Sequence, residues 1–93
     1  IIAEWIFRKN DKIEQGNGIG KRLTKLNKKR RFEGEFEITY SDANGNKSSK
    51  LNLIISFESG YYNLTWNNNE RNTDIGIGIE SDNNLLASYT EVI

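Results

Sequence analysis

Three glutamates, Glu33, Glu35 and Glu37, stand two positions apart along one extended run and are the first candidates for acid–base chemistry. Side chains two apart on a β-strand share a face and lie about 7 Å from each other. Hydrolysis by paired carboxylates needs one carboxyl whose pKa is raised in an apolar pocket. We expect this row to face solvent, because apolar side chains occupy the alternate positions. The glutamates therefore do not predict a hydrolase.

The chain contains no His and no Cys. Without His, the commonest general base is missing and a Ser–His–Asp triad cannot be assembled. Without Cys, neither disulfides nor thiolate zinc sites can form. Asp74, Glu80 and Asp82 do not have the spacing of a calcium loop, and residues 16–20 lack the Gly-Lys-Ser/Thr ending of a phosphate loop. We therefore predict a protein that is not an enzyme and that binds neither a metal nor a cofactor.

The aromatic residues are better candidates for a binding site. The five that we expect to line a cavity are Trp5, Tyr40, Tyr62, Trp66 and Tyr89. Rings can enclose a small molecule while Tyr hydroxyls and Trp N–H groups orient it by hydrogen bonds. The alternative is that the same rings form the hydrophobic core of a barrel too small to hold a cavity.

One segment, residues 21–31, is strongly basic. Its cations are Lys21, Arg22, Lys25, Lys28, Lys29, Arg30 and Arg31. Such a block can bind anions or nucleic acid. It can equally be a solvated loop, or a strand edge that lysines protect against pairing with another chain. We favour the second interpretation, because the three glutamates that follow can neutralise the block. A short helix over residues 21–29 is a further alternative.

The composition limits the remaining possibilities. A chain of 93 residues is expected to form a single domain spanning residues 1–93. Its 13 basic and 13 acidic side chains give no net charge, which argues against nucleic acid or an anionic membrane as the main partner. No apolar run approaches the roughly 20 residues that span a bilayer. We therefore expect no membrane partner, and no feature of the sequence indicates a cellular compartment.

Alternating apolar and polar residues predict about seven β-strands that position these side chains. The expected strands cover residues 1–7, 13–23, 32–40, 50–57, 61–66, 73–80 and 85–93. Asn44-Gly45 and Glu58-Ser59-Gly60 predict tight hairpin turns. Short connections favour an all-β antiparallel meander of seven to eight strands. Closure into a small up-and-down barrel would remove its exposed edges, and a β-sandwich is the alternative.

Two segments of the chain share one pattern. Each carries a Trp followed by a strand with Gly-x-Gly, namely Trp5 with Gly18-Ile19-Gly20 and Trp66 with Gly76-Ile77-Gly78. This indicates two equivalent hairpins in which the glycines let the sheet bend. A Trp could then lie over the glycines of a neighbouring strand, since a large ring needs an opposing surface without side chains. Chance similarity between two hairpins is the alternative.

Four segments carry a family resemblance: Phe32-Glu33-Gly34-Glu35-Phe36, Tyr62-x-Leu64-x-Trp66, Gly76-Ile77-Gly78-Ile79 and Leu86-Ala87-Ser88-Tyr89. Together they resemble the small up-and-down barrels of the lipocalin and avidin kind, as found in bacterial domains of that shape. The resemblance implies a barrel that holds a small apolar or amphipathic ligand. It covers most of the chain as architecture. The chain departs from lipocalins in having Ala3-Glu4 before Trp5, where the Gly-x-Trp motif would stand.

Two functions therefore stay open. The first is a non-catalytic binding module that takes a small apolar or amphipathic ligand between its aromatic walls. The second is a structural or protein-interaction domain with a solid core, able to form a homodimer through an open sheet edge. Binding of single-stranded nucleic acid by residues 21–31 is a weaker third possibility.

Overall fold

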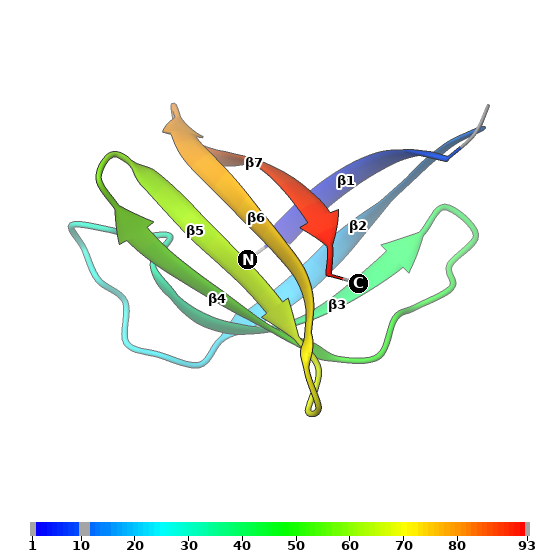
Figure 1. Ribbon diagram of the computed structural model, residues 1–93, viewed down its shortest axis with the longest axis horizontal. Coiled ribbons are helices and arrows are strands. Elements are labelled where there is room, and N and C mark those ends of the chain that lie inside the picture. Colours follow the sequence, from blue (N-terminus) through cyan, green and yellow to red (C-terminus); the bar gives the residue numbers. More distant parts are fainter. Residues whose placement is uncertain (1, 10–11, 93) are drawn as a thin grey trace.

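The computed structural model describes residues 2–9 and 12–92, with side chains at position 4 and from 15 to 92. These residues form one antiparallel sheet whose strand order follows the sequence (Figure 1). The strands are β1 (Ile2–Lys9), β2 (Lys12–Arg22), β3 (Gly34–Asp42), β4 (Leu51–Glu58), β5 (Tyr61–Asn67), β6 (Asn72–Ser81) and β7 (Asn84–Glu91). The all-β meander predicted from the sequence is confirmed. The described residues contain no helix, so the helix considered for residues 21–29 is wrong, and no helix there could span a membrane.

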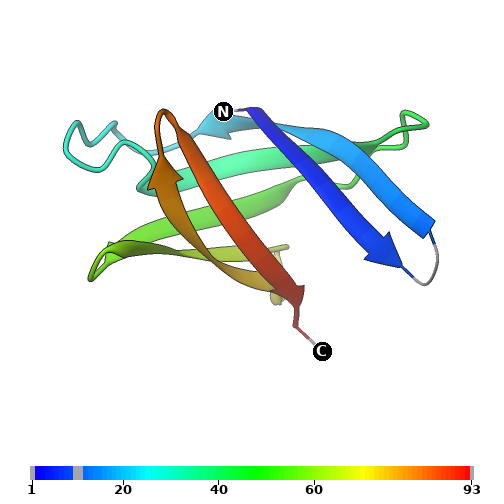
Figure 2. The same cartoon turned by 90° about the horizontal axis from the view of Figure 1, so that it is seen from above.

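The sheet curls strongly but does not close into the expected barrel (Figure 2). β1 and β7 are its two edge strands, and no contact joins them among the described residues. A two-sheet sandwich does not form either, because all seven strands belong to one hydrogen-bonded sheet. The core is already buried by the curl of the central strands, so its formation does not require β7 to meet β1. The architecture is a half-barrel.

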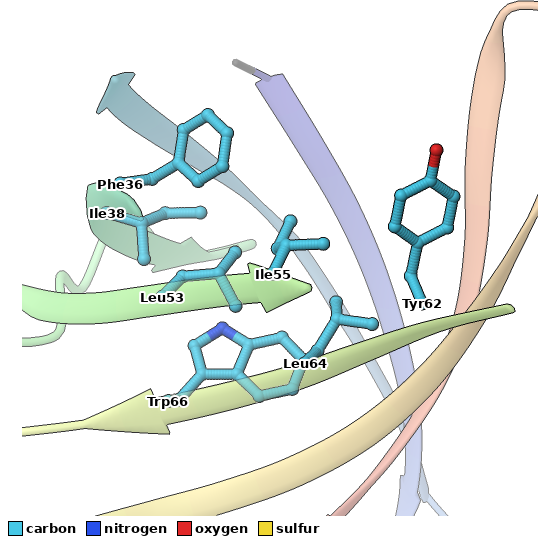
Figure 3. Packing of buried hydrophobic residues seen from close by; sticks show 7 residues of the cluster. All are labelled: Phe36, Ile38, Leu53, Ile55, Tyr62, Leu64 and Trp66. Atoms are coloured by element: carbon cyan, nitrogen blue, oxygen red, sulfur yellow. The ribbon is translucent and has the colours of Figure 1, made fainter. Parts of the chain in front are cut away.

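The core lies on the inner, concave face of the central strands. Its buried side chains are Phe36 and Ile38 on β3, Leu53 and Ile55 on β4, and Tyr62, Leu64 and Trp66 on β5 (Figure 3). They occupy alternate positions because successive strand residues point to opposite faces. Burying each of the aliphatic ones stabilises the fold by roughly 1.5–3 kcal/mol. Among the described side chains, the buried cluster thus belongs to three central strands, and Leu85 of β7 packs against it.

Glycines on the inner face make room for aromatic rings. Gly18 lies beneath Tyr40, where a Cβ would come within 2.7 Å of a ring carbon. Gly76 lies beside Trp66, where a Cβ would come within 3.2 Å of the indole. The expectation that a Trp lies over the glycines of its neighbouring strand is therefore confirmed for Trp66. The two Gly-x-Gly strands belong to the hairpins β1–β2 and β5–β6, as the shared pattern predicts.

Two tight connections follow the sequence signals. Ser59 and Gly60 join β4 to β5 with φ angles of 48° and 97°, the paired positive values of a type I′ turn. In the connection after β3, Gly45 has a φ of 83°. The Asp42 carboxylate accepts hydrogen bonds from the backbone N–H groups of Asn44 and Asn46, each at 2.9 Å. These bonds lower the pKa of Asp42, with those from Asn46 contributing most.

Candidate functional site

Three of the five predicted binding residues come together on the inner face, and we call Tyr40, Trp66 and Tyr89 the aromatic cluster. The indole Nε1–H of Trp66 donates a hydrogen bond to the Tyr40 hydroxyl at 2.6 Å. The rings of Trp66 and Tyr89 meet edge to face, with centroids 6.0 Å apart. Trp66 is buried, whereas Tyr89 is 45% exposed. The cluster therefore runs from the core to the solvent beside β7.

Two carboxylates border the aromatic cluster. Asp74 on β6 stands opposite Trp66 on one side and opposite Glu91 of β7 on the other. Burial raises the pKa of Tyr40 to about 12; the hydrogen bond from Trp66 opposes this shift and the charge of Asp74 adds to it. Burial also raises the pKa of Tyr89, and the charges of Asp74 and Glu91 reinforce it. Both hydroxyls therefore stay protonated at neutral pH and can donate a hydrogen bond.

Tyr62 lies apart from this cluster. Its side chain is buried, with edge-to-face contacts to Phe57 at 5.1 Å and Phe32 at 6.0 Å between centroids. Its hydroxyl donates a hydrogen bond to the Glu80 carboxylate. Burial raises its pKa to about 12, helped by that hydrogen bond and the charge of Glu80. Tyr62 is a core residue in this arrangement rather than part of an open aromatic wall.

The fifth predicted residue, Trp5, is placed only by its backbone. It stands opposite Gly16 in the register of β1 and β2, and its side chain lies outside the described residues. The five residues thus divide into a cluster of three, one core tyrosine, and one position known by register alone.

The outer, convex face carries an apolar surface that the sequence analysis did not single out. Its exposed side chains, which we call the outer patch, are Tyr61 on β5, Ile75, Ile77 and Ile79 on β6, and Leu86 on β7. A depression of about 360 Å³ is lined by four of these residues together with Gly78, Ala87 and Ser88. None of the five predicted binding residues lines it. The sequence feature that indicates this apolar surface is the set of three isoleucines that alternate with Gly76 and Gly78.

The edge of the sheet formed by β7 lies next to the outer patch. The Val92 N–H donates to the Thr73 carbonyl at 2.9 Å, which makes Thr73 and Val92 a hydrogen-bonded pair. Hydrogen-bonded pairs alternate along an antiparallel ladder. The residues of β7 whose N–H and C=O groups point away from β6 are therefore Leu85, Ala87, Tyr89 and Glu91. In the part of the chain that the structure describes, no strand pairs with this edge.

The arginines of the basic segment pack against the core. Each of its arginines covers a phenylalanine ring. The distances from guanidinium carbon to ring centroid are 4.6 Å for Arg22 and Phe36, 3.9 Å for Arg30 and Phe57, and 4.9 Å for Arg31 and Phe32. Arg22 also donates to the carbonyls of Glu33 at 2.8 Å and Arg31 at 2.6 Å. The arginines thus hold the segment after β2 against the core, and the lysines are exposed.

The three glutamates of the row make separate contacts. Glu33 lies before β3, where its carboxylate accepts the backbone N–H of Phe57 at 2.9 Å. Glu35 is exposed, and Glu37 forms an exposed ion pair with Lys50 at 3.6 Å. No group of three or more acidic residues within the described residues is arranged to hold a metal ion.

Comparison with protein-family models, with curated proteins and with solved structures gave no match. The described residues define a small antiparallel half-barrel whose β7 edge is open beside the apolar outer patch.

Proposed function

We propose that this protein is a protein-interaction domain that binds a β-strand of its partner along the free edge of β7. The observation that carries the proposal is the row of outward N–H and C=O groups on Leu85, Ala87, Tyr89 and Glu91, which have no strand beside them among the described residues. An added strand would satisfy all of these groups through main-chain hydrogen bonds. Such bonds provide affinity without requiring a particular sequence.

Side chains beside the edge would provide the specificity. On the outer face, Leu86 is 56% exposed on β7, and Ile79 stands directly opposite it on β6. On the inner face, Tyr89 stands at the edge with 45% of its surface exposed. A partner strand would therefore meet an apolar contact on each of its two faces. Exposed apolar surface of this kind marks interaction sites in soluble proteins.

The position of the described depression also favours an interaction domain over an enclosed ligand site. It lies on the convex face, whereas the inner face of the central strands is filled by the seven buried side chains of the core. A small-molecule site of the lipocalin kind would need the opposite arrangement, an empty interior lined by the aromatic residues.

A photoreactive amino acid introduced at Thr90 tests the proposal in the cells that produce the protein. Thr90 is exposed on β7, and Ser56, exposed on the outer face of the central strand β4, is the matched control position. We expect a covalent polypeptide adduct from position 90 and none from position 56. The adduct should disappear in an Ala87→Pro variant, because proline removes an outward N–H that β6 does not use. Absence of any adduct at position 90 would overturn the proposal.

The aromatic cluster supports a second candidate, the binding of a small amphipathic molecule. The specific observation is that the Tyr40 hydroxyl accepts from Trp66, so its own proton remains available for a ligand, with the exposed ring of Tyr89 beside it. Trp66 fluorescence in a Trp5→Phe background, titrated with amphipathic probes, tests this function. Binding should weaken at least tenfold in Tyr89→Ala. Native mass spectra without a carried ligand and unchanged fluorescence would contradict it.

A further inference from the structure

We propose that the partner strand is β7 of a second copy of this chain, paired antiparallel about a two-fold axis beside Ser88. This inference rests on the proposed function and names the partner. The two half-barrels would then share one continuous sheet.

The first argument is that β7 carries little of the usual protection of an edge strand. Its eight residues contain a single charged side chain, Glu91, at the very end, and no Lys or Pro. Its register with β6 runs without a bulge from Glu91 back to Asn84. Edge strands of monomeric proteins normally carry such interruptions because an open edge pairs with other chains. The other edge, β1, has three charged residues within eight: Glu4, Arg8 and Lys9.

The second argument is that hydrogen bonding selects one register. Across the new seam, a residue with outward groups must stand opposite another such residue. A two-fold axis at Ser88 places Leu85 opposite Glu91 and Ala87 opposite Tyr89, so all four outward residues of each copy are paired. An axis at Ala87 would instead carry Glu91 onto Asn83 in the turn, and an axis at Tyr89 would carry Leu85 beyond the end of the partner strand.

The third argument is that this register is self-complementary in size and charge. The bulky Tyr89 stands beside the small Ala87, and Leu86 stands beside Thr90. The only charge of the strand, Glu91, stands opposite Leu85, so no like charges face each other across the seam. The chain has no net charge, so two copies do not repel each other as a whole. A closed two-fold pairing also uses the same edge on both copies and leaves no free β7 edge for further growth.

The absence of native cysteines allows a direct test by disulfide formation. Ser88 would form a non-hydrogen-bonded pair with itself, in which Cα atoms are about 4.5 Å apart, a distance that a disulfide spans. We expect a purified Ser88→Cys variant to form a disulfide-linked dimer under mild oxidation. A Ser56→Cys variant, exposed on the same face in the central strand β4, should stay unlinked.

Light scattering after size-exclusion chromatography completes the test. The unmodified chain should show twice the mass of one chain, and Ala87→Pro should show the mass of one chain while keeping its β circular dichroism. A single-chain mass at all concentrations, together with no Ser88→Cys dimer, would overturn this inference. A dimer that survives Ala87→Pro would also overturn it. A Thr90 adduct in cells with a mass other than twice the chain would support the interaction domain but rule out pairing with a second copy. Absence of any adduct would rule out both the interaction domain and the self-pairing.

Discussion

At the scale of single residues, the hydrogen bonds of the polar atoms on two aromatic side chains contribute to the stability of the fold. The Trp66 N–H and the Tyr62 hydroxyl are both partly buried, and each bonds to one partner, Tyr40 and Glu80 respectively. A buried polar group that loses its partner costs about 1–3 kcal/mol, more than the bond itself contributes. Removing either partner should therefore lower the stability of the fold more, the more deeply the group that it satisfies is buried.

Removing the Tyr40 hydroxyl should destabilise the fold. Tyr40→Phe keeps the ring over Gly18 but leaves the Trp66 N–H without its acceptor. We expect the free energy of unfolding in urea to fall by about 1–3 kcal/mol. Tyr61→Phe, on the exposed outer face, is the matched control and should change it by less than about 0.5 kcal/mol. Equal effects of the two substitutions would contradict the role of this hydrogen bond.

The raised tyrosine pKa values predict a loss of stability at high pH. The pKa values of Tyr40 and Tyr62 are about 12 in the folded protein, whereas tyrosine in an unfolded chain titrates near about 10. Between these values the unfolded chain releases protons that the folded chain keeps, so the free energy of unfolding falls as pH rises. It should be unaffected by these groups below about pH 10 and decrease up to about pH 12. Urea unfolding across this range measures the slope.

A variant separates the tyrosines from other alkaline effects. Tyr62→Phe removes one of the two phenols whose pKa is about 12 in the folded protein, so its stability should depend less steeply on pH over the same interval. An unchanged slope in Tyr62→Phe would show that Tyr62 does not titrate differently in the two states.

At the scale of elements, the close approach of β2 to the ring of Tyr40 depends on one missing side chain. Gly18 is buried, and a Cβ there would lie 2.7 Å from Cδ1 of Tyr40. Real Cβ contacts are longer, so either the ring or the strand must move. The hydroxyl of the same side chain accepts the Trp66 hydrogen bond, which couples the β2–β3 pairing to the core of β5.

Gly18→Ala should therefore destabilise the protein although alanine suits a strand no worse than glycine. We expect the free energy of unfolding to fall by about 1–3 kcal/mol, the usual cost of overpacking. Ile19→Ala changes the next residue of β2, which is 70% exposed, and should cost less than about 0.5 kcal/mol. Thermal unfolding followed by circular dichroism would measure both. A neutral Gly18→Ala would mean that Tyr40 can move aside freely.

At the scale of the whole molecule, the two faces of the sheet have different roles. Among the described side chains, the inner face holds the buried core, and the outer face exposes the outer patch near β7 together with Ile54 of β4 and Ile19 of β2. Among the described residues, β1 and β7 each pair with a single strand, so the edge of the sheet beside the outer patch is open as well. The combination of an unprotected edge and an adjacent apolar surface is what distinguishes this molecule from a closed, self-contained barrel.

Placing a charge in the outer patch should raise solubility without lowering stability. Ile77 is 57% exposed in the middle of β6, so Ile77→Lys removes apolar surface from solvent and adds a charge. We expect a higher protein concentration before precipitation in ammonium sulfate, with the free energy of unfolding unchanged within about 0.5 kcal/mol. Ile19→Lys adds the same charge away from the patch and should have a smaller effect. Equal solubility gains would show that the patch has no special tendency to associate.

Alternation along the chain was sufficient to predict the class of fold and most of the core. Buried residues stand two positions apart within each central strand, as in Phe36 and Ile38, Leu53 and Ile55, and Leu64 and Trp66. In a strand, this spacing places the side chains on one face. Ser59-Gly60 marked its turn because glycine readily adopts the positive φ that the turn needs. These features are local, so they can be read from neighbouring residues.

Only the tertiary structure decided whether the sheet closes into a barrel, which aromatic side chains come together, and that the β7 edge stays free. Whether β7 meets β1 depends on curl accumulated over the whole sheet, which no local pattern specifies. Tyr62 and Tyr89 look alike in sequence, yet one is 1% exposed and the other 45%, because only one lies on a central strand. The sequence thus determined which residues face the same way, whereas three-dimensional packing determined which of them are covered and which remain available to a partner.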